Sequence, residues 1–323
     1  MKRLLLLLIL IGLTACRQVP EGGAPAVTPA SQTSEVSETS EVSPSPVPVA
    51  PTKTPPPTST EAVLAPTAAS TLAPDAWMQI PVVPTTVSER ARFIYQRGLE
   101  MGRDPHHFSK IGDCQNVESY FLAVFETPEE YSLGEDNAYL SETIEYYQGS
   151  FSRDSLAVKG GFNVAAILSP LRADPEKCPK NTSPLDCELE TWNPSIALIS
   201  LEEWWEDRPA EDYANYMRIA VDDAISKGVL PILATRAGNT PKVMALNAAI
   251  AQVAYENDIP LWNFWLAIQP LPSHGLSPDG FHLTFARNFF DDPLRMQSAW
   301  PWRNLTALQT LHAVRVGLES TTP

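Results

Sequence analysis

The sequence reads IALISL at residues 196–201, VLPILAT at 229–235 and PLWNF at 260–264. Each run is short and almost wholly apolar, which is typical of strands that are buried on both faces of a parallel sheet. Because such strands need crossover connections, the segments between them should be helices. These three runs therefore predict a parallel sheet at the centre of the fold.

The segments around these strands have the spacing of amphipathic helices. Apolar residues recur at helical intervals over 213–224, with Gly228 placed as a C-terminal stop, and again over 243–253 and 305–314. Upstream, shorter strands are predicted at 108–111 and 155–158, with a helix at 117–125 between them. Strand and helix alternate, so we expect a three-layer α/β/α sandwich with a mostly parallel sheet.

The N-terminus has the pattern of an export signal. Lys2 and Arg3 precede an apolar run at 4–13 that is too short to span a bilayer, and the run ends in Leu-Thr-Ala-Cys at 13–16. This ending resembles the lipobox of bacterial lipoproteins, which implies cleavage after residue 15 and acylation of Cys16. The alternative is an ordinary signal peptide with a chance cysteine. The interpretation places the protein outside the cytoplasm, with its lipid in the cell membrane.

A linker is predicted to follow the anchor, over residues 16–76. Residues 17–76 contain 12 Pro, 17 Ser or Thr and no aromatic residue, a composition that favours a disordered, semi-stiff spacer. Every aromatic residue of the chain lies in 77–323, which is long enough for one domain with a full core. The net charge of −15 argues against nucleic acid as a partner and against electrostatic binding to anionic lipid.

The remaining three cysteines divide into a pair and a single residue. Cys178 and Cys187 flank a polar, proline-containing segment, so in an oxidising compartment a local disulfide is the simplest interpretation. Cys114 is then left without a cysteine partner. Its thiol is either buried and inert or reactive, and the sequence leaves both open.

Two polar motifs stand where the working edge of a parallel sheet is expected. Gly-Asp-Cys-Gln at 112–115 follows the first strand, and Ser-Pro-Asp-Gly-Phe-His-Leu-Thr at 277–284 follows the last. Together they resemble the first and last motifs of the SGNH, or GDSL, hydrolase family, and the resemblance covers the whole domain. It implies a flavodoxin-like sandwich and ester hydrolysis or acyl transfer, with no metal and no cofactor.

The resemblance also implies roles for individual residues. Cys114 stands at the position of the nucleophilic serine, His282 at that of the general base, and Asp279 at that of the acid that orients the base. The Gly-Gly-Phe stretch at 160–162 resembles the second motif, and we take Gly161 and Cys114 as the oxyanion donors. A thiol in a strand-to-helix turn should also feel the helix N-terminus, which favours the thiolate.

The third motif departs from the family. The family has Gly-x-Asn-Asp after the third strand, whereas this chain has Leu-Glu-Glu-Trp-Trp-Glu at 201–206, with Trp204 where the asparagine would be. Losing one oxyanion donor costs about 10²–10³ in rate. Asp113, Glu203 and Trp204 are candidate substrate contacts. Trp204 and Trp205 fit either the core or a platform for a sugar ring.

Other interpretations of the polar residues are weaker. A glycosidase pair drawn from Glu202, Glu203 and Asp279 is disfavoured because adjacent glutamates point in different directions. The His-His pair at 106–107 has no further ligand at metal-binding spacing, which favours a solvated loop. Two functions remain: a surface esterase or acyl transferase, acting on acylated carbohydrate or a similar cell-wall ester, and a degenerate relative that binds a glycan or another ligand.

Overall fold

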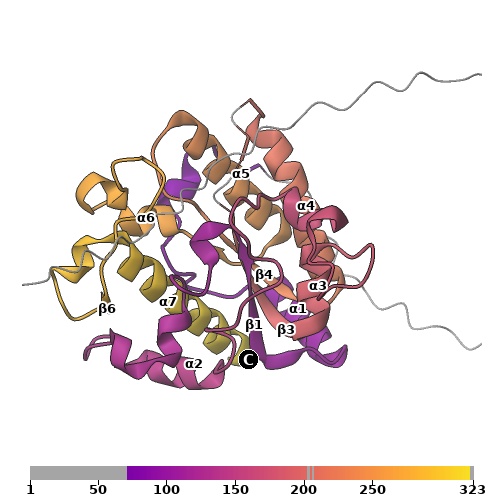
Figure 1. The fold of residues 1–323 in the computed structure, drawn as a ribbon, viewed down its shortest axis with the longest axis horizontal. Coiled ribbons are helices and arrows are strands. Elements are labelled where there is room, and N and C mark those ends of the chain that lie inside the picture. The colour runs from indigo at the N-terminus through magenta and orange to yellow at the C-terminus, as the bar shows by residue number, and fades with distance from the viewer. Residues whose placement is uncertain (1–70, 202–203, 206, 321–323) are drawn as a thin grey trace, which may run out of the picture. The chain divides into compact units, whose positions relative to one another are not determined.

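The computed structural model describes residues 71–201, 204–205 and 207–320, which belong to the compact unit Leu64–Pro323 (Figure 1). The predicted signal peptide, Cys16 and Glu203 lie outside the described residues, as does the predicted linker up to residue 70. The last six residues of that linker are described. There the Leu72 N–H donates to Oε1 of Gln252 at 2.8 Å, and the Leu72 side chain packs against the core.

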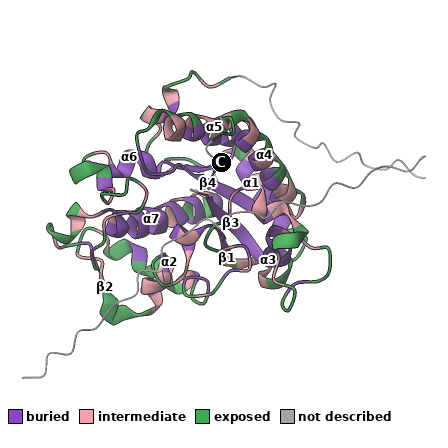
Figure 2. Cartoon of the chain, turned by 45° about the horizontal axis from the view of Figure 1, so that its top comes forward, coloured by how far each residue is buried: buried purple, intermediate pink, exposed green. Residues whose placement is uncertain are grey.

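Four parallel strands form the main sheet, in the order β1–β3–β4–β5. They are β1 (Asp104–Gly112), β3 (Pro194–Ser200), β4 (Leu230–Ala234) and β5 (Leu261–Trp262). Every residue of β3 and β4 is buried, as apolar strands covered on both faces should be (Figure 2). The four strands confirm the runs predicted at 108–111, 196–201, 229–235 and 260–264. Two short strands, β2 (Tyr131–Ser132) and β6 (Asn288–Phe289), pair separately.

Helices cover the sheet on both sides. The described α-helices are α1 (Glu89–Glu100), α2 (Ser141–Tyr146), α3 (Pro184–Trp192), α4 (Ala210–Ser226), α5 (Pro241–Asn257), α6 (Phe264–Ile268) and α7 (Ala299–Glu319). In Figure 1, α2 and α7 lie on one side of the strands and α3, α4 and α5 on the other. The chain is therefore an α/β/α sandwich around a parallel sheet, as predicted.

Residues of β1 show how the two layers are attached. Phe108 points to one layer, where its ring meets Tyr147 and Phe151 edge-on at 5.4 and 5.1 Å. The next residue, Ser109, points to the other layer and donates through its Oγ to Glu188 of α3 at 2.5 Å. This alternation is the ordinary two-residue period of a strand.

Three of the helices match the predicted periodic segments. Helices α4, α5 and α7 contain 213–224, 243–253 and 305–314, and Gly228 takes a left-handed φ of 72° two residues after α4 ends, which confirms it as the stop. The α1, α2, α3 and α6 helices were not predicted. Helix α3 begins with a side-chain cap, in which Ser183 accepts from the Asp186 N–H.

The prediction of a helix at 117–125 is wrong. Leu122 has a left-handed φ of 68°, which an α-helix does not allow, and its N–H donates to Oδ1 of Asn304 in α7 at 2.8 Å. Only a short 3-10 turn, Ala123–Glu126, follows. The tertiary contact with α7 has replaced the local helical hydrogen bond.

The strand predicted at 155–158 is reduced to a single bridge. Val158 pairs with Gly112 in parallel fashion, which places this segment at the free edge of β1. The Leu156 N–H donates to Oε2 of the buried Glu188 at 2.9 Å instead of to a neighbouring strand. A ladder longer than one bridge therefore does not form.

The structure confirms the predicted disulfide between Cys178 and Cys187, whose Cα atoms are 5.6 Å apart. Cys187 lies inside α3, so the bridge fixes the preceding loop to that helix. Cys114 takes no part in a disulfide. Within the part of the chain that the structure describes, no helix combines the length and hydropathy that a membrane span requires.

Candidate active site

The end of β1 leads directly into Asp113 and Cys114. Asp113 is fully buried and its carboxylate accepts from the Gln115 N–H at 3.0 Å, which closes the turn after the strand. Its burial argues against the predicted substrate contact. Cys114 is half-buried and begins a 3-10 turn of three residues, Cys114–Asn116. The predicted helix N-terminus beside the thiol is therefore missing, because one short turn has no appreciable dipole.

The loop that carries His282 is organised around Asp279. One carboxylate oxygen, Oδ1, accepts from the N–H groups of Phe281 and His282, each at 3.0 Å. The other, Oδ2, lies 2.6 Å from Nδ1 of the His282 ring. The hydrogen bond from His282, followed by the two backbone N–H groups, lowers the pKa of the Asp279 carboxyl to about 2. An ionised Asp279 selects the tautomer in which Nδ1 carries the proton and Nε2 is a free acceptor.

A hydrogen bond joins the turn Cys114–Asn116 (the thiol turn) to the loop 277–284 that carries His282 (the histidine loop). Gln115, which is 2% exposed, donates through Nε2 to the carbonyl oxygen of Phe281 at 3.3 Å. The residues next to Cys114 and next to His282 are therefore in direct contact, although they are far apart in the sequence. This convergence at the carboxyl ends of the strands is what the two sequence motifs predict.

The glycine that approaches Cys114 is Gly160. A Cβ built on Gly160 would lie 3.8 Å from the Cys114 Cβ, whereas one built on Gly161 would meet nothing within 4 Å. The Lys159 N–H donates to the carbonyl oxygen of Gly112 at 3.3 Å, and this hydrogen bond holds Gly160 near Cys114. Gly161 has a left-handed φ of 80°, so it shapes the turn. By proximity Gly160, rather than our choice of Gly161, is the better candidate for the second oxyanion donor.

Trp204, which stands where the resemblance would place an asparagine, belongs to the core. It is 7% exposed and packs edge-on against Tyr213 at 5.3 Å, and its indole N–H donates to the Arg208 carbonyl at 3.3 Å. It therefore supplies no donor to a site, and of its two sequence interpretations the structure supports the core. The neighbouring Trp205 is 43% exposed, with the Arg208 guanidinium 5.5 Å from its ring centroid.

A buried arginine beneath the turn was missed by the sequence analysis. Arg303 of α7 is fully buried and donates through Nη2 to Ser200 Oγ at 2.8 Å, at the end of β3. Asn116 donates to the Ser200 carbonyl at 2.7 Å, so the thiol turn and the end of β3 are tied together. The aromatic rings of Phe121 and Phe264 lie 4.8 and 5.1 Å from the guanidinium. The one available signal was an arginine directly after the apolar run Ala-Trp-Pro-Trp at 299–302.

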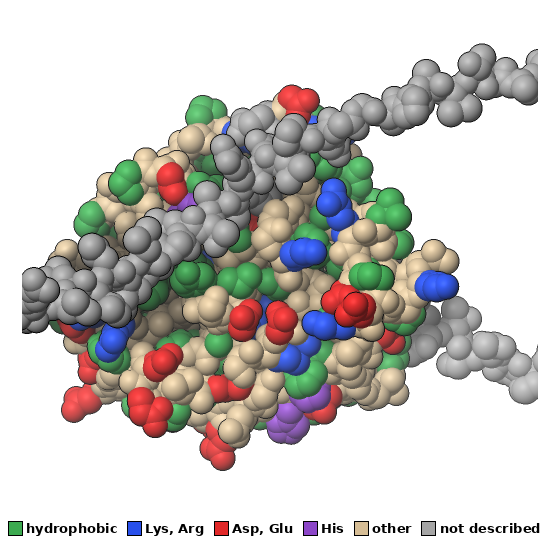
Figure 3. Space-filling model, viewed as in Figure 1, with side chains coloured by type: hydrophobic (Ala, Val, Ile, Leu, Met, Phe, Trp, Pro, Cys, Tyr) green, Lys and Arg blue, Asp and Glu red, His purple; other side chains and the backbone are tan. Residues whose placement is uncertain are grey.

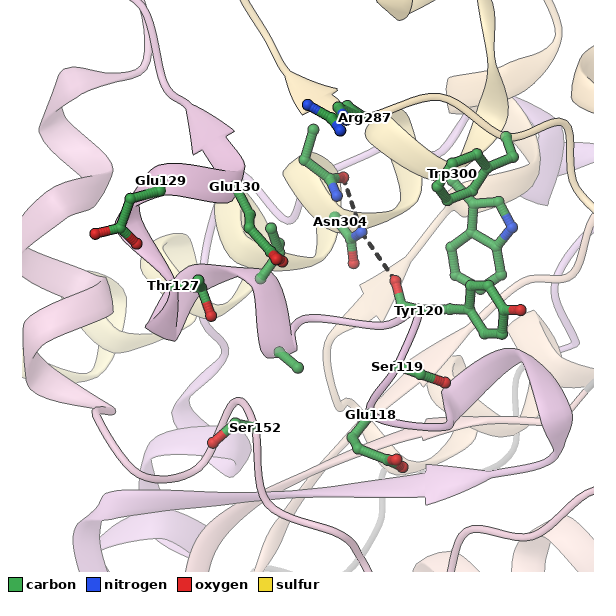
Figure 4. A pocket seen from close by; sticks show the side chains of 14 residues that line it. Glu118, Ser119, Tyr120, Thr127, Glu129, Glu130, Ser152, Arg287, Trp300 and Asn304 are labelled. Atoms are coloured by element: carbon green, nitrogen blue, oxygen red, sulfur yellow. Dashed lines mark hydrogen bonds between the residues drawn. The ribbon is translucent and has the colours of Figure 1, made fainter. Parts of the chain in front are cut away.

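A cavity of about 550 Å³ is lined by residues that follow the thiol turn and the histidine loop (Figure 4). The segment 118–120 begins four residues after Cys114, and Phe285 comes three residues after His282. Its lining residues are Glu118, Ser119, Tyr120, Ala123, Val124, Thr127, Glu129, Glu130, Ser152, Phe285, Arg287, Asn288, Trp300 and Asn304. These residues come from four separate segments, so no local pattern in the sequence identifies them as a set.

The two histidines considered for metal binding have structural contacts. The His107 ring stacks on Trp192 at 4.0 Å, and its Nδ1 lies 2.8 Å from the Trp192 carbonyl oxygen. The His106 ring lies against Tyr146 at 4.3 Å. In the described ranges, no group of three or more His, Cys, Asp and Glu residues is placed to hold a metal ion.

Comparison with known proteins adds no relative. No family model matches this chain, and no curated protein is significantly similar to it.

Proposed function

We propose that the domain is a hydrolase of the SGNH, or GDSL, type that cleaves an ester through a thiol. Cys114 is the nucleophile, His282 the general base and Asp279 the group that orients the base. The observation that carries the proposal is the 2.6 Å contact between Asp279 Oδ2 and His282 Nδ1, which leaves Nε2 to accept a proton. The Gln115–Phe281 hydrogen bond supports it, because it brings the nucleophile segment to the base loop.

The reaction proceeds through a thioester. His282 Nε2 takes the proton of the Cys114 thiol, and the thiolate attacks the carbonyl carbon of the ester. The bond to the alcohol oxygen breaks, and the alcohol leaves with the proton that His282 held. Water, deprotonated by His282, then attacks the thioester and releases the carboxylic acid and the thiol. Backbone N–H groups of Cys114 and of the glycine turn at 160–161 bind the oxyanion in both steps.

The test is a rapid-mixing experiment with an activated aryl ester. We expect a burst of phenol close to one equivalent per protein, followed by slow turnover, because deacylation lacks the third oxyanion donor. Cys114→Ala abolishes the burst and His282→Ala strongly suppresses it. His274→Ala is the matched control, since this histidine is exposed and its Nδ1 lies 3.0 Å from the Gln269 carbonyl oxygen, outside the Asp279–His282 pair. No burst, together with no alkylation of Cys114 by iodoacetamide at neutral pH, would contradict the proposal.

A second candidate function is a binding protein that has lost turnover. The burial of Trp204 where the family has its asparagine favours it, because the oxyanion site is left with backbone donors alone. This candidate expects ligand binding with no acyl-enzyme at any ester concentration. Mass spectrometry of the protein after incubation with the aryl ester separates the two, since an acyl adduct on Cys114 belongs only to the hydrolase.

We further propose that the enzyme acts on acylated carbohydrate or a similar ester outside the cytoplasm. The support is the lipobox-like sequence that ends at Cys16. The acyl chains of this residue would hold the domain at the membrane, and the linker would set its distance from the surface.

A further inference from the structure

The cavity lined by Tyr120, Glu130, Trp300 and Asn304 has walls of two chemical kinds. Figure 4 shows Glu130 reaching from one side towards Asn304 at the base, with Tyr120 and Trp300 on the other side. Asn304 holds the base by donating through Nδ2 to Asn288 Oδ1 at 2.9 Å and to the Tyr120 carbonyl at 3.1 Å. The volume of the cavity, about 550 Å³, falls in the usual range for small-molecule sites, about 300–1,000 Å³.

The charge of the lining is negative. The lining contains three carboxylates, those of Glu118, Glu129 and Glu130, and one guanidinium, that of Arg287. Among the described residues, no Lys, Arg or His lies within 4.0 Å of these three carboxylates. On the face in Figure 3, acidic side chains also predominate at the lower left, while Lys and Arg lie mainly to the right. A phosphate or carboxylate ligand would be repelled here, and a cation attracted.

The opposite wall presents aromatic surface. The rings of Tyr120 and Trp300 stack at 5.5 Å with an angle of 26°. Tyr120 is 52% exposed and Phe285, which also lines the cavity, is 66% exposed. Contiguous exposed apolar surface, unlike a single exposed side chain, often marks a ligand-binding groove. The face of such a ring attracts an ammonium group that lies within about 6 Å of its centroid.

We propose that this cavity binds an organic cation, a ligand whose ammonium group lies between the carboxylates and the Tyr120 ring. The carboxylates alone would attract any cation, and the aromatic wall alone would bind any apolar molecule. Together they favour a ligand that carries a positive charge on an apolar body. Binding requires neither the Cys114 thiol nor His282, so the proposal goes beyond the ester hydrolysis and does not depend on it.

The first experiment compares matched ligands by calorimetry on the full chain. Choline is tested against 3,3-dimethylbutan-1-ol, which has the same shape without the charge, and glucosamine against glucose. We expect at least one cation to bind at least about tenfold more tightly than its neutral partner, and this preference to shrink as salt is raised. If choline binds more tightly than glucosamine, the ligand is an amino alcohol. If glucosamine binds more tightly, the ligand is an amino sugar. Neutral partners that bind as well as the cations, or no binding by either cation, would overturn the proposal.

The second experiment tests the two walls separately. Glu130→Gln should weaken binding of the preferred cation about tenfold, whereas Glu176→Gln, which removes the same charge from an exposed loop, should leave it unchanged. Tyr120→Ala should weaken it similarly, and Tyr120→Phe should retain it because the ring face remains. Equal effects of Glu130→Gln and Glu176→Gln would show that net charge alone attracts the ligand and would refute the site. Cys114→Ala should bind normally, which separates this result from the test of the hydrolase.

Discussion

At the residue scale, Asp279 and His282 form the best-defined part of the site. Both side chains are half exposed, at 50 and 51%, so their geometry is held by hydrogen bonds rather than by burial. Because the pKa of Asp279 is lowered to about 2, this carboxyl stays ionised in mild acid. Loss of activity between pH 4 and 6 would therefore report a group other than Asp279.

Asp279→Asn should lower the rate of acyl-enzyme formation by at least about 100-fold, because an amide favours the wrong tautomer of the His282 ring. The measurement is the burst rate with an aryl ester at pH 7.5. Asp292→Asn is the control, since Asp292 accepts from the N–H groups of Leu294 and Arg295 in a similar turn outside the site. Equal burst rates in the protein and in Asp279→Asn would remove Asp279 from the mechanism.

Lys110 of β1 predicts an unusual dependence of stability on pH. Lys110 is 2% exposed, and its ammonium donates to the Phe151 carbonyl at 2.7 Å. Burial, and secondarily the positive charge of Arg153, lowers the pKa of Lys110 from 10.5 to about 8. Between these two values the unfolded chain binds a proton that the folded chain does not, so the free energy of unfolding rises with pH in this window.

We therefore expect the free energy of unfolding in urea to increase by about 1–2 kcal/mol between pH 8 and 9.5. Lys110→Met should lack this increase. Both proteins should carry Cys114→Ala, so that thiol–disulfide exchange does not disturb the comparison. Above pH 10 the trend reverses, because burial raises the pKa of Tyr147 and the unfolded chain then loses a proton first. Parallel pH profiles for the two proteins would show that the amine is not responsible.

At the element scale, two glycines allow α1 to lie against the turn after α4. A Cβ on Gly98 would lie 1.9 Å from the Gly228 carbonyl oxygen, and a Cβ on Gly228 would lie 2.6 Å from the Gly98 Cα. Gly228 also has a left-handed φ of 72°. The sequence identified Gly228 as a helix stop, but the contact with Gly98 is visible only in the fold.

Gly228→Ala should destabilise the protein by about 2 kcal/mol or more, because the strained φ and the clash with α1 add. Gly102→Ala isolates the first contribution. Gly102 has a similar φ of 89°, but nothing lies within 4 Å of its added Cβ, and we expect a loss of only about 1 kcal/mol. Urea titration of both variants measures the difference. Equal losses would mean that α1 moves away at no cost.

At the scale of the whole molecule, one cysteine is predicted to decide where the protein resides. Cys16→Ser should release it from the membrane fraction, because the predicted lipid is lost and a net charge of −15 does not favour anionic lipid. Fractionation of cells that express the two forms is the measurement. Lys53→Ser, a substitution in the predicted linker, is the control and should remain with the membrane. Membrane association of the Cys16→Ser form would contradict the lipobox interpretation.

The sequence by itself determined the layers of the fold and the disulfide. Apolar strands and amphipathic helices carry their period in the chain, so β3, β4, α4 and α5 could be predicted from local pattern. The bridge between Cys178 and Cys187 spans nine residues, so it too is a nearly local feature. The motifs at 112–115 and 277–284 are predicted to meet because strand ends in a parallel sheet share one edge, and a hydrogen bond from Gln115 to Phe281 joins the two segments.

Only the tertiary structure decided what surrounds that site. Asn304 accepts a hydrogen bond from the Leu122 N–H, which prevents the helix predicted there. Glu188 accepts one from the Leu156 N–H, which shortens the predicted strand. Trp204 enters the core, and Gly160 rather than Gly161 approaches Cys114. These outcomes depend on partners that lie up to 182 residues away in the chain. Local propensity is worth a few tenths of a kcal/mol per residue, whereas a buried polar group left without its partner costs about 1–3 kcal/mol, so the long-range contact prevails.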